Sequence, residues 1–274
     1  MGVITISHET GSGGPEIGVA LAARVNYRYV DQDVISQAAQ RYGCVEEKLI
    51  RLDETKPSIF ARFDVETRYY ITVLQSALLD VAEADNVVIL GRGGQILLRG
   101  ISHVVRVLVR AAFDLRVKRV LEKMATRVGT VDVRTTANMV RRADQEKIGR
   151  VRYVFDVEWS DPMLYDVVIS TDKLSTEASV ELIAGLCQSP EFAPTERSQQ
   201  AVRDRALASR VRAALSAHPE GRRYRINVEA HRGTIELEGT GGLEVAVAVA
   251  QAVPGVMEVK QTMVEMPPIA PFVG

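Results

Sequence analysis

Cysteine is scarce in this chain, and no stretch of it is long and apolar. The 274 residues include two cysteines, Cys44 and Cys187, too few for a disulfide framework and without the spacing of metal ligands. No run approaches the roughly 18 apolar residues of a membrane span, and the N-terminal residues lack the basic and apolar regions of a secretory signal. We therefore expect a cytoplasmic protein with reduced thiols and no transmembrane segment.

Aromatic residues (5%) and net charge (−1) are also low, so we expect no general attraction to nucleic acid or to anionic lipid. The charge is nevertheless uneven along the chain. Residues 92–152 carry 15 basic and 5 acidic side chains, whereas the segments on either side are acidic. This local excess could mark an anion-binding site, or it could form a helical surface whose arginines pair with the acidic flanks.

The length predicts about two domains. Residues 1–187 alternate strand-like and helix-like segments, residues 188–200 (QSPEFAPTERSQQ) have the composition of a linker, residues 201–265 form a second unit, and residues 266–274 form an irregular tail. In the first unit we expect strands at 3–7, 28–30, 87–90, 104–109 and 167–170, with helices at 17–25, 33–41, 65–84, 95–98, 115–124, 136–152 and 176–187.

Such alternation is typical of an α/β fold, a parallel sheet covered by helices. The second unit has another order: a helix at 207–217, strands at 226–230 and 234–238 around the turn Arg232-Gly233, a helix at 243–252 and a strand at 256–264. This order, αββαβ, describes a small α+β domain.

A glycine-rich turn follows the first predicted strand. Gly11, Ser12, Gly13 and Gly14 lie between that strand and a helix that opens at Pro15, a favoured first helical position. Backbone N–H groups in such a turn can close on a phosphate, and the helix dipole favours an anion there. The alternative is a tight strand-to-helix turn that binds nothing.

The turn departs from the usual phosphate-binding loop, GxxxxGK[ST], because its lysine and its hydroxyl residue are both missing. A carboxylate at Glu16 would repel a triphosphate unless it is turned away or bridged by a cation. No direct metal motif is present, although Ser12, Glu9 or Asp31 could contact Mg²⁺ through water.

Two other kinds of site are disfavoured. A serine-hydrolase nucleophile needs glycine two residues before the serine, and Thr10 stands at that position before Ser12. The four histidines form no spaced pair, which argues against a metal site and a catalytic triad.

Three segments in order resemble the cytidylate kinase-like family: ITISHETGSGGPEIGVALAARVNYRYVDQDVI (4–35), VVILGRGGQILL (87–98) and residues 141–183. The resemblance covers nearly all of residues 1–187. It implies the fold of the P-loop nucleoside monophosphate kinases: a five-stranded parallel sheet, a region that binds the monophosphate, and a lid that carries arginines. It also implies ATP as phosphoryl donor, Mg²⁺ as cofactor and a nucleotide as substrate.

The resemblance assigns roles to particular residues. Gly11, Ser12, Gly13 and Gly14 would cradle the donor phosphates, Asp31 opens the monophosphate-binding region, and Arg92 grips the monophosphate. Arg142, Lys147 and Arg150 match the basic, catalytic positions of the lid, and Arg62 and Arg68 are further phosphate candidates. Typical cytidylate kinases have Gly-Arg-Asp where this chain has Gly-Arg-Gly, so Gly93 removes a carboxylate expected near the sugar.

These lid assignments agree with the chemistry of phosphoryl transfer, which needs positioning and positive charge around the phosphate oxygens. Arginine suits that task because its guanidinium binds phosphate through two hydrogen bonds. The alternative for the lid is a routine helix-surface pair between Glu146 and Arg150, four residues apart.

The second unit resembles the BON domain in its element order and in its turn glycines, Gly233 and Gly255. That resemblance implies a small-molecule or lipid ligand. The basic cluster Arg222, Arg223 and Arg225 is more simply explained as a solvated edge that discourages strand pairing.

Three functions fit these observations. The first is an ATP-dependent kinase of nucleoside monophosphates such as CMP or dCMP. The second is a degenerate kinase domain that binds a nucleotide and signals through the BON-like domain, which the missing loop lysine and Gly93 would favour. The third is an interaction protein in which both phosphate features are vestigial.

Overall fold

The computed structural model describes residues 2–42, 65–128 and 131–265. Arg62 and the predicted tail at 266–274 lie outside these residues. Within them, no helix is long and apolar enough to cross a membrane.

A five-stranded parallel sheet forms the centre of the first unit, as the alternating pattern predicted. Its order is β2-β3-β1-β4-β5, and Val3 at the start of β1 pairs with Val87 on one side and Val104 on the other. The strands are nearly continuous apolar runs because both faces of the sheet are covered. They are β1 (Val3–His8), β2 (Arg28–Val30), β3 (Val87–Leu90), β4 (Val104–Arg110) and β5 (Val167–Ser170).

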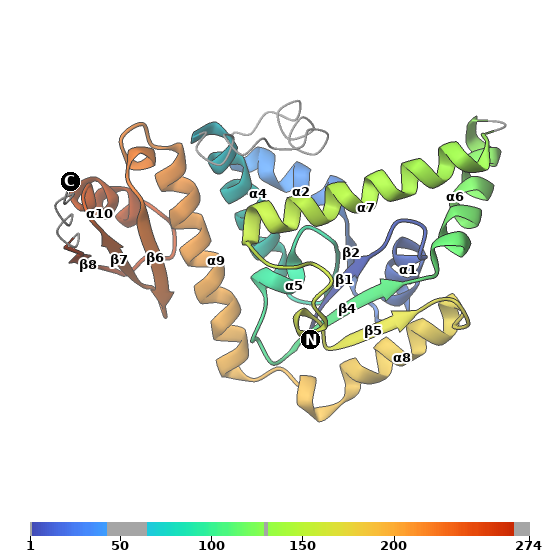
Figure 1. Ribbon diagram of the computed structural model, residues 1–274. Helices are drawn as coiled ribbons and strands as arrows, with labels where there is room; N and C mark the ends of the chain where they lie inside the picture. The colour runs from blue at the N-terminus through green and yellow to red at the C-terminus, as the bar shows by residue number, and fades with distance from the viewer. Residues whose placement is uncertain (1, 43–64, 129–130, 266–274) are drawn as a thin grey trace, which may run out of the picture.

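Helices cover each face of this sheet (Figure 1). On one face, Ile4 and Ile6 of β1 pack in one core with Ile17 of α1 and Ile183 of α8. On the other face, Val3 packs in a core built largely from α4. The helices of the first unit are α1 (Gly14–Val25), α2 (Gln32–Ala39), α4 (Val65–Glu83), α5 (Gly94–Leu97), α6 (Phe113–Val128), α7 (Val133–Phe155) and α8 (Thr176–Gln188).

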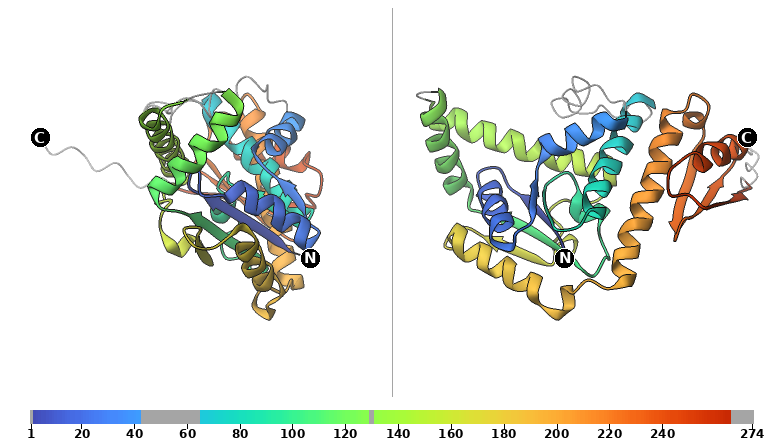
Figure 2. Two further views of the ribbon diagram at one scale, coloured as in Figure 1. Left: turned by 90° about the vertical axis from the view of Figure 1, so that its right-hand side faces the viewer. Right: turned by 180° about the vertical axis from the view of Figure 1, so that it is seen from behind.

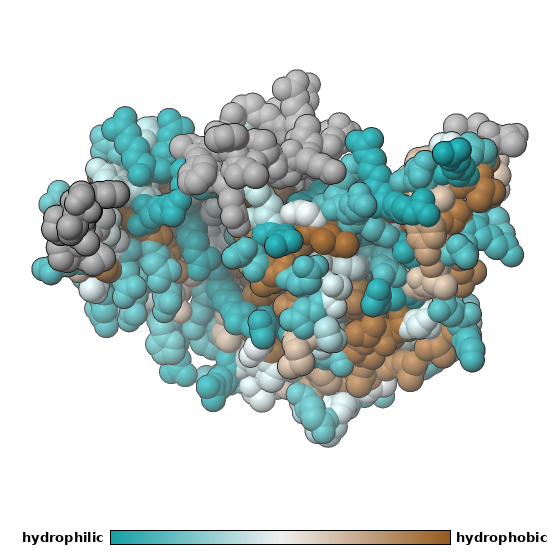
Figure 3. All heavy atoms as spheres, viewed as in Figure 1, coloured by the Kyte–Doolittle hydropathy of each residue, from teal (hydrophilic) through white to brown (hydrophobic). Residues whose placement is uncertain are grey.

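The long helix α7 crosses above the end of the sheet where the strands terminate (Figures 1 and 2). Asp132 caps its first turn by accepting a hydrogen bond from the N–H of Thr135. On the face seen in Figure 3, apolar side chains gather beneath α7, and the surface over α9 is mostly hydrophilic. In open α/β sheets ligands bind at the carboxyl ends of the strands, so α7 lies where a lid would be expected.

The second unit has the predicted αββαβ order. It consists of α9 (Glu196–Ala217), β6 (Ile226–His231), β7 (Thr234–Gly239), α10 (Leu243–Gln251) and β8 (Glu258–Met263). Strands β6 and β7 pair antiparallel, whereas β7 and β8 pair parallel. Arg232 and Gly233 both have positive φ angles, 48° and 87°, as a two-residue hairpin turn of type I′ requires.

The expected linker is shorter than the composition of residues 188–200 suggested. Helix α9 begins at Glu196 because Thr195 and Ser198 cap its first turn reciprocally, each side chain bonding the other residue's backbone N–H. The helix was predicted only from residue 207 because its apolar residues lie on two faces and show no single stripe.

Helix α9 contributes to both hydrophobic cores. Val202 and Ala206 pack with the core around α4, while Leu207 and Val211 pack with β7 and α10 in the second unit. Figure 2 shows α9 standing between the sheet of the first unit and the small sheet of the second. One continuous helix therefore joins the two units.

Ion pairs fix α9 to α4. Arg210 donates to Asp80 at 2.8 Å and also bonds Glu83. Asp80 in turn accepts a hydrogen bond of 2.5 Å from the hydroxyl of Tyr42. Arg205 donates to the carbonyl oxygens of Leu97, the last residue of α5, and of Arg99.

We predict that Arg210→Met lowers the free energy of unfolding by about 1–3 kcal/mol, because Asp80 and Glu83 lose their shared cation while remaining half-buried. The matched control is Arg203→Met on the same helix, whose guanidinium bonds Gln200 at the surface. The control should change stability by no more than about 0.5 kcal/mol. Urea denaturation of both variants measures the difference, and equal effects would contradict it.

Candidate functional site

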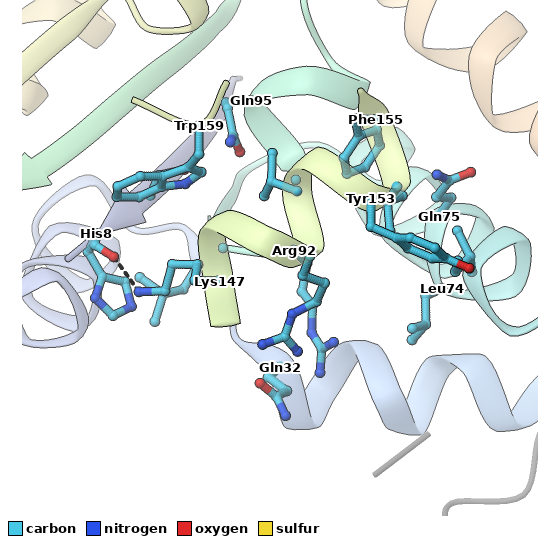
Figure 4. A pocket seen from close by; sticks show the side chains of 18 of the residues that line it. His8, Gln32, Leu74, Gln75, Arg92, Gln95, Lys147, Tyr153, Phe155 and Trp159 are labelled. Atoms are coloured by element: carbon cyan, nitrogen blue, oxygen red, sulfur yellow. Dashed lines mark hydrogen bonds between the residues drawn. The ribbon is translucent and has the colours of Figure 1, made fainter. Parts of the chain in front are cut away.

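A cavity of about 530 Å³ lies at the carboxyl ends of β1 and β3, beneath the second half of α7 (Figure 4). Its volume is within the range of small-molecule sites. It is walled by the end of β1 (Ser7, His8), the start of α2 (Asp31, Gln32, Asp33), α4 (Ile71, Leu74, Gln75), the turn after β3 (Leu90, Gly91, Arg92, Gly93, Gln95), α7 (Lys147, Arg150, Val151, Tyr153, Val154, Phe155) and Trp159.

Four of the predicted site residues meet in this cavity: Asp31, Arg92, Lys147 and Arg150. They come from segments up to 119 positions apart (150 − 31). The described lining holds these three cations and two carboxylates, Asp31 and Asp33, so it carries a net positive charge. That balance suits a phosphate-bearing ligand.

Arg92 is aimed into the cavity by an unusual turn. Gly91, Arg92 and Gly93 have consecutive positive φ angles of 74°, 58° and 76°. Arginine rarely adopts this conformation, which costs on the order of 1 kcal/mol and occurs preferentially at functional sites. Figure 4 shows the Arg92 guanidinium pointing towards Gln32 of α2.

The structure explains why glycine stands at position 93. A Cβ atom there would lie 2.5 Å from the ring of Phe155. Phe155 at the end of α7 therefore fills the space that a side chain at 93 would need, and it presents an aromatic ring to the cavity.

Helix α7 is attached directly to the glycine-rich turn. Asp144 accepts hydrogen bonds from the Thr10 N–H at 2.9 Å and from Arg116 at 2.6 Å, and Arg116 also donates to the Thr10 carbonyl at 3.0 Å. The side chains of Arg116 and Asp144 are only 8% and 18% exposed. Burial alone would raise the pKa of Asp144, but these hydrogen bonds outweigh it and hold the pKa below its usual value.

Neither Arg116 nor Asp144 was predicted from the sequence. Both lie in the basic segment 92–152, but nothing local distinguishes them from its other charged residues. Their importance arises from the packing of α6 and α7 on the turn after β1.

Lys147 lies three residues further along α7, beside the end of β1. Its ammonium group donates a hydrogen bond to the carbonyl oxygen of His8 and lies 5.8 Å from the centre of the Trp159 ring. Burial, reinforced by Arg150 and Arg116, lowers the pKa of Lys147 to about 8 despite the opposing charge of Asp144. Burial and then Lys147 lower the pKa of His8 to about 4.

The glycine-rich turn has the conformation that its glycines permit. Gly11 and Gly13 have φ angles of 81° and 89°, and a Cβ at Gly11 would lie 2.6 Å from the Arg116 carbonyl oxygen. Gly13 faces open space. The turn and the N-terminus of α1 lie next to the cavity but outside its lining.

Two of the side chains proposed to contact Mg²⁺ form hydrogen bonds with other parts of the protein. The Ser12 hydroxyl is buried and donates to the Val109 carbonyl at 3.0 Å. The Glu9 carboxylate accepts from Arg110 at 3.0 Å and from the Ala111 N–H at 3.1 Å. Each side chain thus ties the turn to β4 or to the residue after it, and a contact of either with Mg²⁺ through water stays a prediction.

Asp31 is placed differently, because it lines the cavity while one of its carboxylate oxygens accepts the N–H groups of Asp33 and Val34. Glu16 forms an ion pair of 3.0 Å with Lys123 and does not line the cavity. The cation required to neutralise Glu16 is therefore present in the protein.

The remaining candidates are not brought to the cavity. Arg142 is 76% exposed and pairs with Glu146 on the surface of α7 at 2.7 Å. Arg68 on α4 is absent from the cavity lining, and Arg62 lies outside the described residues. Arg142 faces solvent in this structure, and its catalytic role stays a prediction.

The strand order, the glycine-rich turn and the cation-lined cavity together define a kinase-like α/β protein. The family model of the cytidylate kinase-like family matches residues 3–173, and the chain belongs to that family. The match covers the sheet, the turn and α7, but it ends before α9 and the second unit.

Curated relatives and a solved structure agree with this assignment. A cytidylate kinase of Methanopyrus kandleri is 23% identical over 66% of this chain and 90% of its own length. A cytidylate kinase of Methanothermobacter thermautotrophicus is 26% identical over 65% of this chain and 99% of its own. The crystal structure of an uncharacterized protein from Eubacterium ventriosum has the same fold, with a TM-score of 0.54 and 19% identity over 69% of this chain and 99% of its own.

The low pKa of His8 predicts an acid-sensitive fold. The unfolded chain binds a proton at His8 near pH 6.5 and the folded chain only near pH 4, so the unfolded state holds more protons between these values. Stability should therefore fall as the pH drops from 6.5 towards 4.

Urea denaturation at pH 7.5 and pH 5 tests this. The loss of unfolding free energy should be smaller in His8→Gln than in the wild type, by on the order of 1–2 kcal/mol. His103, whose pKa is also lowered by burial, contributes equally to both proteins. An unchanged loss in His8→Gln would contradict the assignment to His8.

Proposed function

We propose that this protein transfers the γ-phosphoryl group of ATP to a pyrimidine nucleoside monophosphate, CMP or dCMP, in the presence of Mg²⁺. The observation that carries the proposal is the convergence of Arg92, Lys147 and Arg150 on one cavity beside the glycine-rich turn. Phosphoryl transfer depends on positioning and on neutralising the phosphate oxygens, and these cations supply both.

The cavity is assigned to the acceptor nucleotide. Its cations lie near β1 and β3, while Leu74 of α4 and Phe155 of α7 supply apolar surface and Gln75 supplies an amide. This combination of an apolar wall with a few polar groups is typical of small-molecule sites. The base choice rests on the names of the two curated relatives, both cytidylate kinases.

The glycine-rich turn is assigned to the donor phosphates. The open space at Gly13 and the N-terminus of α1 allow backbone N–H groups and the helix dipole to face an anion. When bound, Mg²⁺ neutralises charge on the donor phosphates. Among the described residues no group of three or more metal-ligating side chains is present. Magnesium usually binds through one or two carboxylates, water and phosphate, and Asp31 is the carboxylate that fits this role.

A second candidate function is nucleotide binding without turnover, with a regulatory output through the second unit. The loop without lysine and the ring of Phe155 over Gly93 favour it. For the second unit we retain the proposal of a BON-like domain with a small-molecule ligand. A surface of anionic lipid is the poorer fit, because Glu229, Glu236 and Glu238 are exposed on its sheet.

The activity can be tested with purified protein, ATP and millimolar Mg²⁺ against CMP, dCMP, UMP, AMP and GMP. Formation of ADP together with the nucleoside diphosphate should be fastest with CMP or dCMP. Saturable nucleotide binding by calorimetry without any transfer would replace this proposal with the second candidate. Neither binding nor transfer would overturn both.

A second prediction concerns Arg92. Arg92→Met should raise the KM for the acceptor monophosphate at least tenfold and leave the affinity for ATP within about threefold, since a charge-assisted bond to phosphate is worth roughly 1.5–3 kcal/mol. Arg99→Met, an exposed arginine beyond α5, is the matched control and should alter neither value. Steady-state kinetics with each substrate varied separately distinguishes the two sites, and an equal effect on both substrates would contradict the assignment.

A further inference from the structure

The missing loop lysine is accompanied by a second departure from the usual pattern, at His8 before the glycine-rich turn. When the pattern GxxxxGK[ST] is placed on this chain with its second glycine at Gly13, its first glycine falls on His8 and its lysine on Gly14. The hydroxyl position falls on Pro15. The chain thus has histidine at position 8, where the pattern has glycine, and glycine at position 14, where the pattern has lysine.

These two departures compensate for one another in space. A Cβ atom at Gly14 would lie 2.3 Å from the Cβ of His8 and 2.6 Å from its Cγ. Real Cβ contacts are never this short, so no side chain fits at position 14 while His8 is present. His8 fills the space that the Cβ of a lysine at position 14 would need. Its imidazole has a pKa of about 4, so it is neutral near pH 7 and supplies no positive charge.

A cation from another helix reaches His8 at the start of the turn. The Lys147 ammonium group binds the carbonyl oxygen of His8 and lines the cavity, as Figure 4 shows. Helix α7 is held there by the bonds of Asp144 to the Thr10 N–H and to Arg116. The charged or titratable groups that act on Lys147 are Asp144 and Arg150 from α7, Arg116 from α6, and Glu9 and His8 from the end of β1.

We propose that Lys147 supplies, from helix α7, the phosphate-binding ammonium that the glycine-rich turn lacks, and that Asp144 positions it. The inference rests on the proposed phosphoryl transfer and deepens it. In that step the bond from the γ-phosphorus to the bridging oxygen breaks, and a bond from the same phosphorus to an acceptor phosphate oxygen forms. Lys147 keeps its protons and neutralises the charge that develops on the transferred group.

The first test compares Lys147→Met with Arg152→Met, an exposed cation of the same helix. Lys147→Met should lower kcat with CMP at least about 100-fold, the loss typical of removing one charge-stabilising group, and should weaken ATP binding measured by calorimetry. Arg152→Met should stay within about threefold of the wild type. Equal activity of the two variants, with an active wild type, would overturn the inference and leave the proposed function standing.

The second test moves the ammonium back to the turn. In the Lys147→Met background, the double change His8→Gly and Gly14→Lys places lysine at its usual position and removes the clash. We expect at least a tenfold recovery of kcat and of ATP affinity. A folded triple variant, verified by its thermal melting, that regains neither would overturn the inference.

The pH profile gives a readout that does not depend on this rescue. The wild-type rate should fall as the pH rises through about 8, where Lys147 loses its proton, and Lys147→Arg should retain its rate there. Asp144→Asn should move the alkaline fall to lower pH, because Asp144 supports the charge of Lys147. A wild-type alkaline limb that persists unchanged in Lys147→Arg would contradict the role.

A wild type that neither binds ATP nor transfers phosphate would overturn the proposed function and this inference together.

Discussion

The attachment of α7 to the glycine-rich turn is the constraint on which the site depends. Asp144 and Arg116 are nearly buried, and a buried ion pair is tolerated only when its remaining donors and acceptors are bonded. Here they are: Arg116 donates to the carbonyls of Thr10 and Ala111 as well as to Asp144, and Asp144 also accepts the Thr10 N–H. Because Lys147 and Arg150 lie one and two turns along the same helix, this one attachment places both cations at the cavity.

The opposite wall of the cavity depends on a different contact. Leu74 and Gln75 belong to α4, and α4 packs along α9, whose other face belongs to the second unit. Arg210 of α9 holds Asp80, and Asp80 holds the hydroxyl of Tyr42. The second unit is therefore joined to the helix that forms the acceptor side of the cavity by apolar packing and by a continuous chain of polar contacts.

Much of the fold was predictable because its signals are local. Continuous apolar runs and helical periodicity mark the parallel sheet and its helices, and β3 and β5 begin and end where expected. The start of α9 was missed because its apolar residues face two partners. In the site, Asp31 and Arg92 follow strands directly, so their position at the carboxyl edge could be expected. The contacts of Ser12 with Val109 and of Thr10 with Asp144 join residues about 100 positions apart or more, and no local pattern reveals them.

The uneven charge of the sequence allowed two interpretations, and the structure separates the residues to which each applies. Some arginines of the basic segment pair with the acidic flanks: Arg106 bonds Asp166 at 2.6 Å, and Arg110 bonds Glu9 at 3.0 Å. These pairs neutralise the ends of β4 and contribute to packing. Arg92, Lys147 and Arg150 instead line the cavity.

The basic segment therefore contains two kinds of cation, those paired with carboxylates and those that line the cavity. Only their position in the fold distinguishes them. Cations beside a strand in the sheet are matched by neighbouring carboxylates, because an unpaired charge there would be costly to bury. Cations at the carboxyl edge face a cavity whose lining, within the described part of the chain, has Asp31 and Asp33 as its only carboxylates. The positive charge that remains there is what an anionic ligand would neutralise.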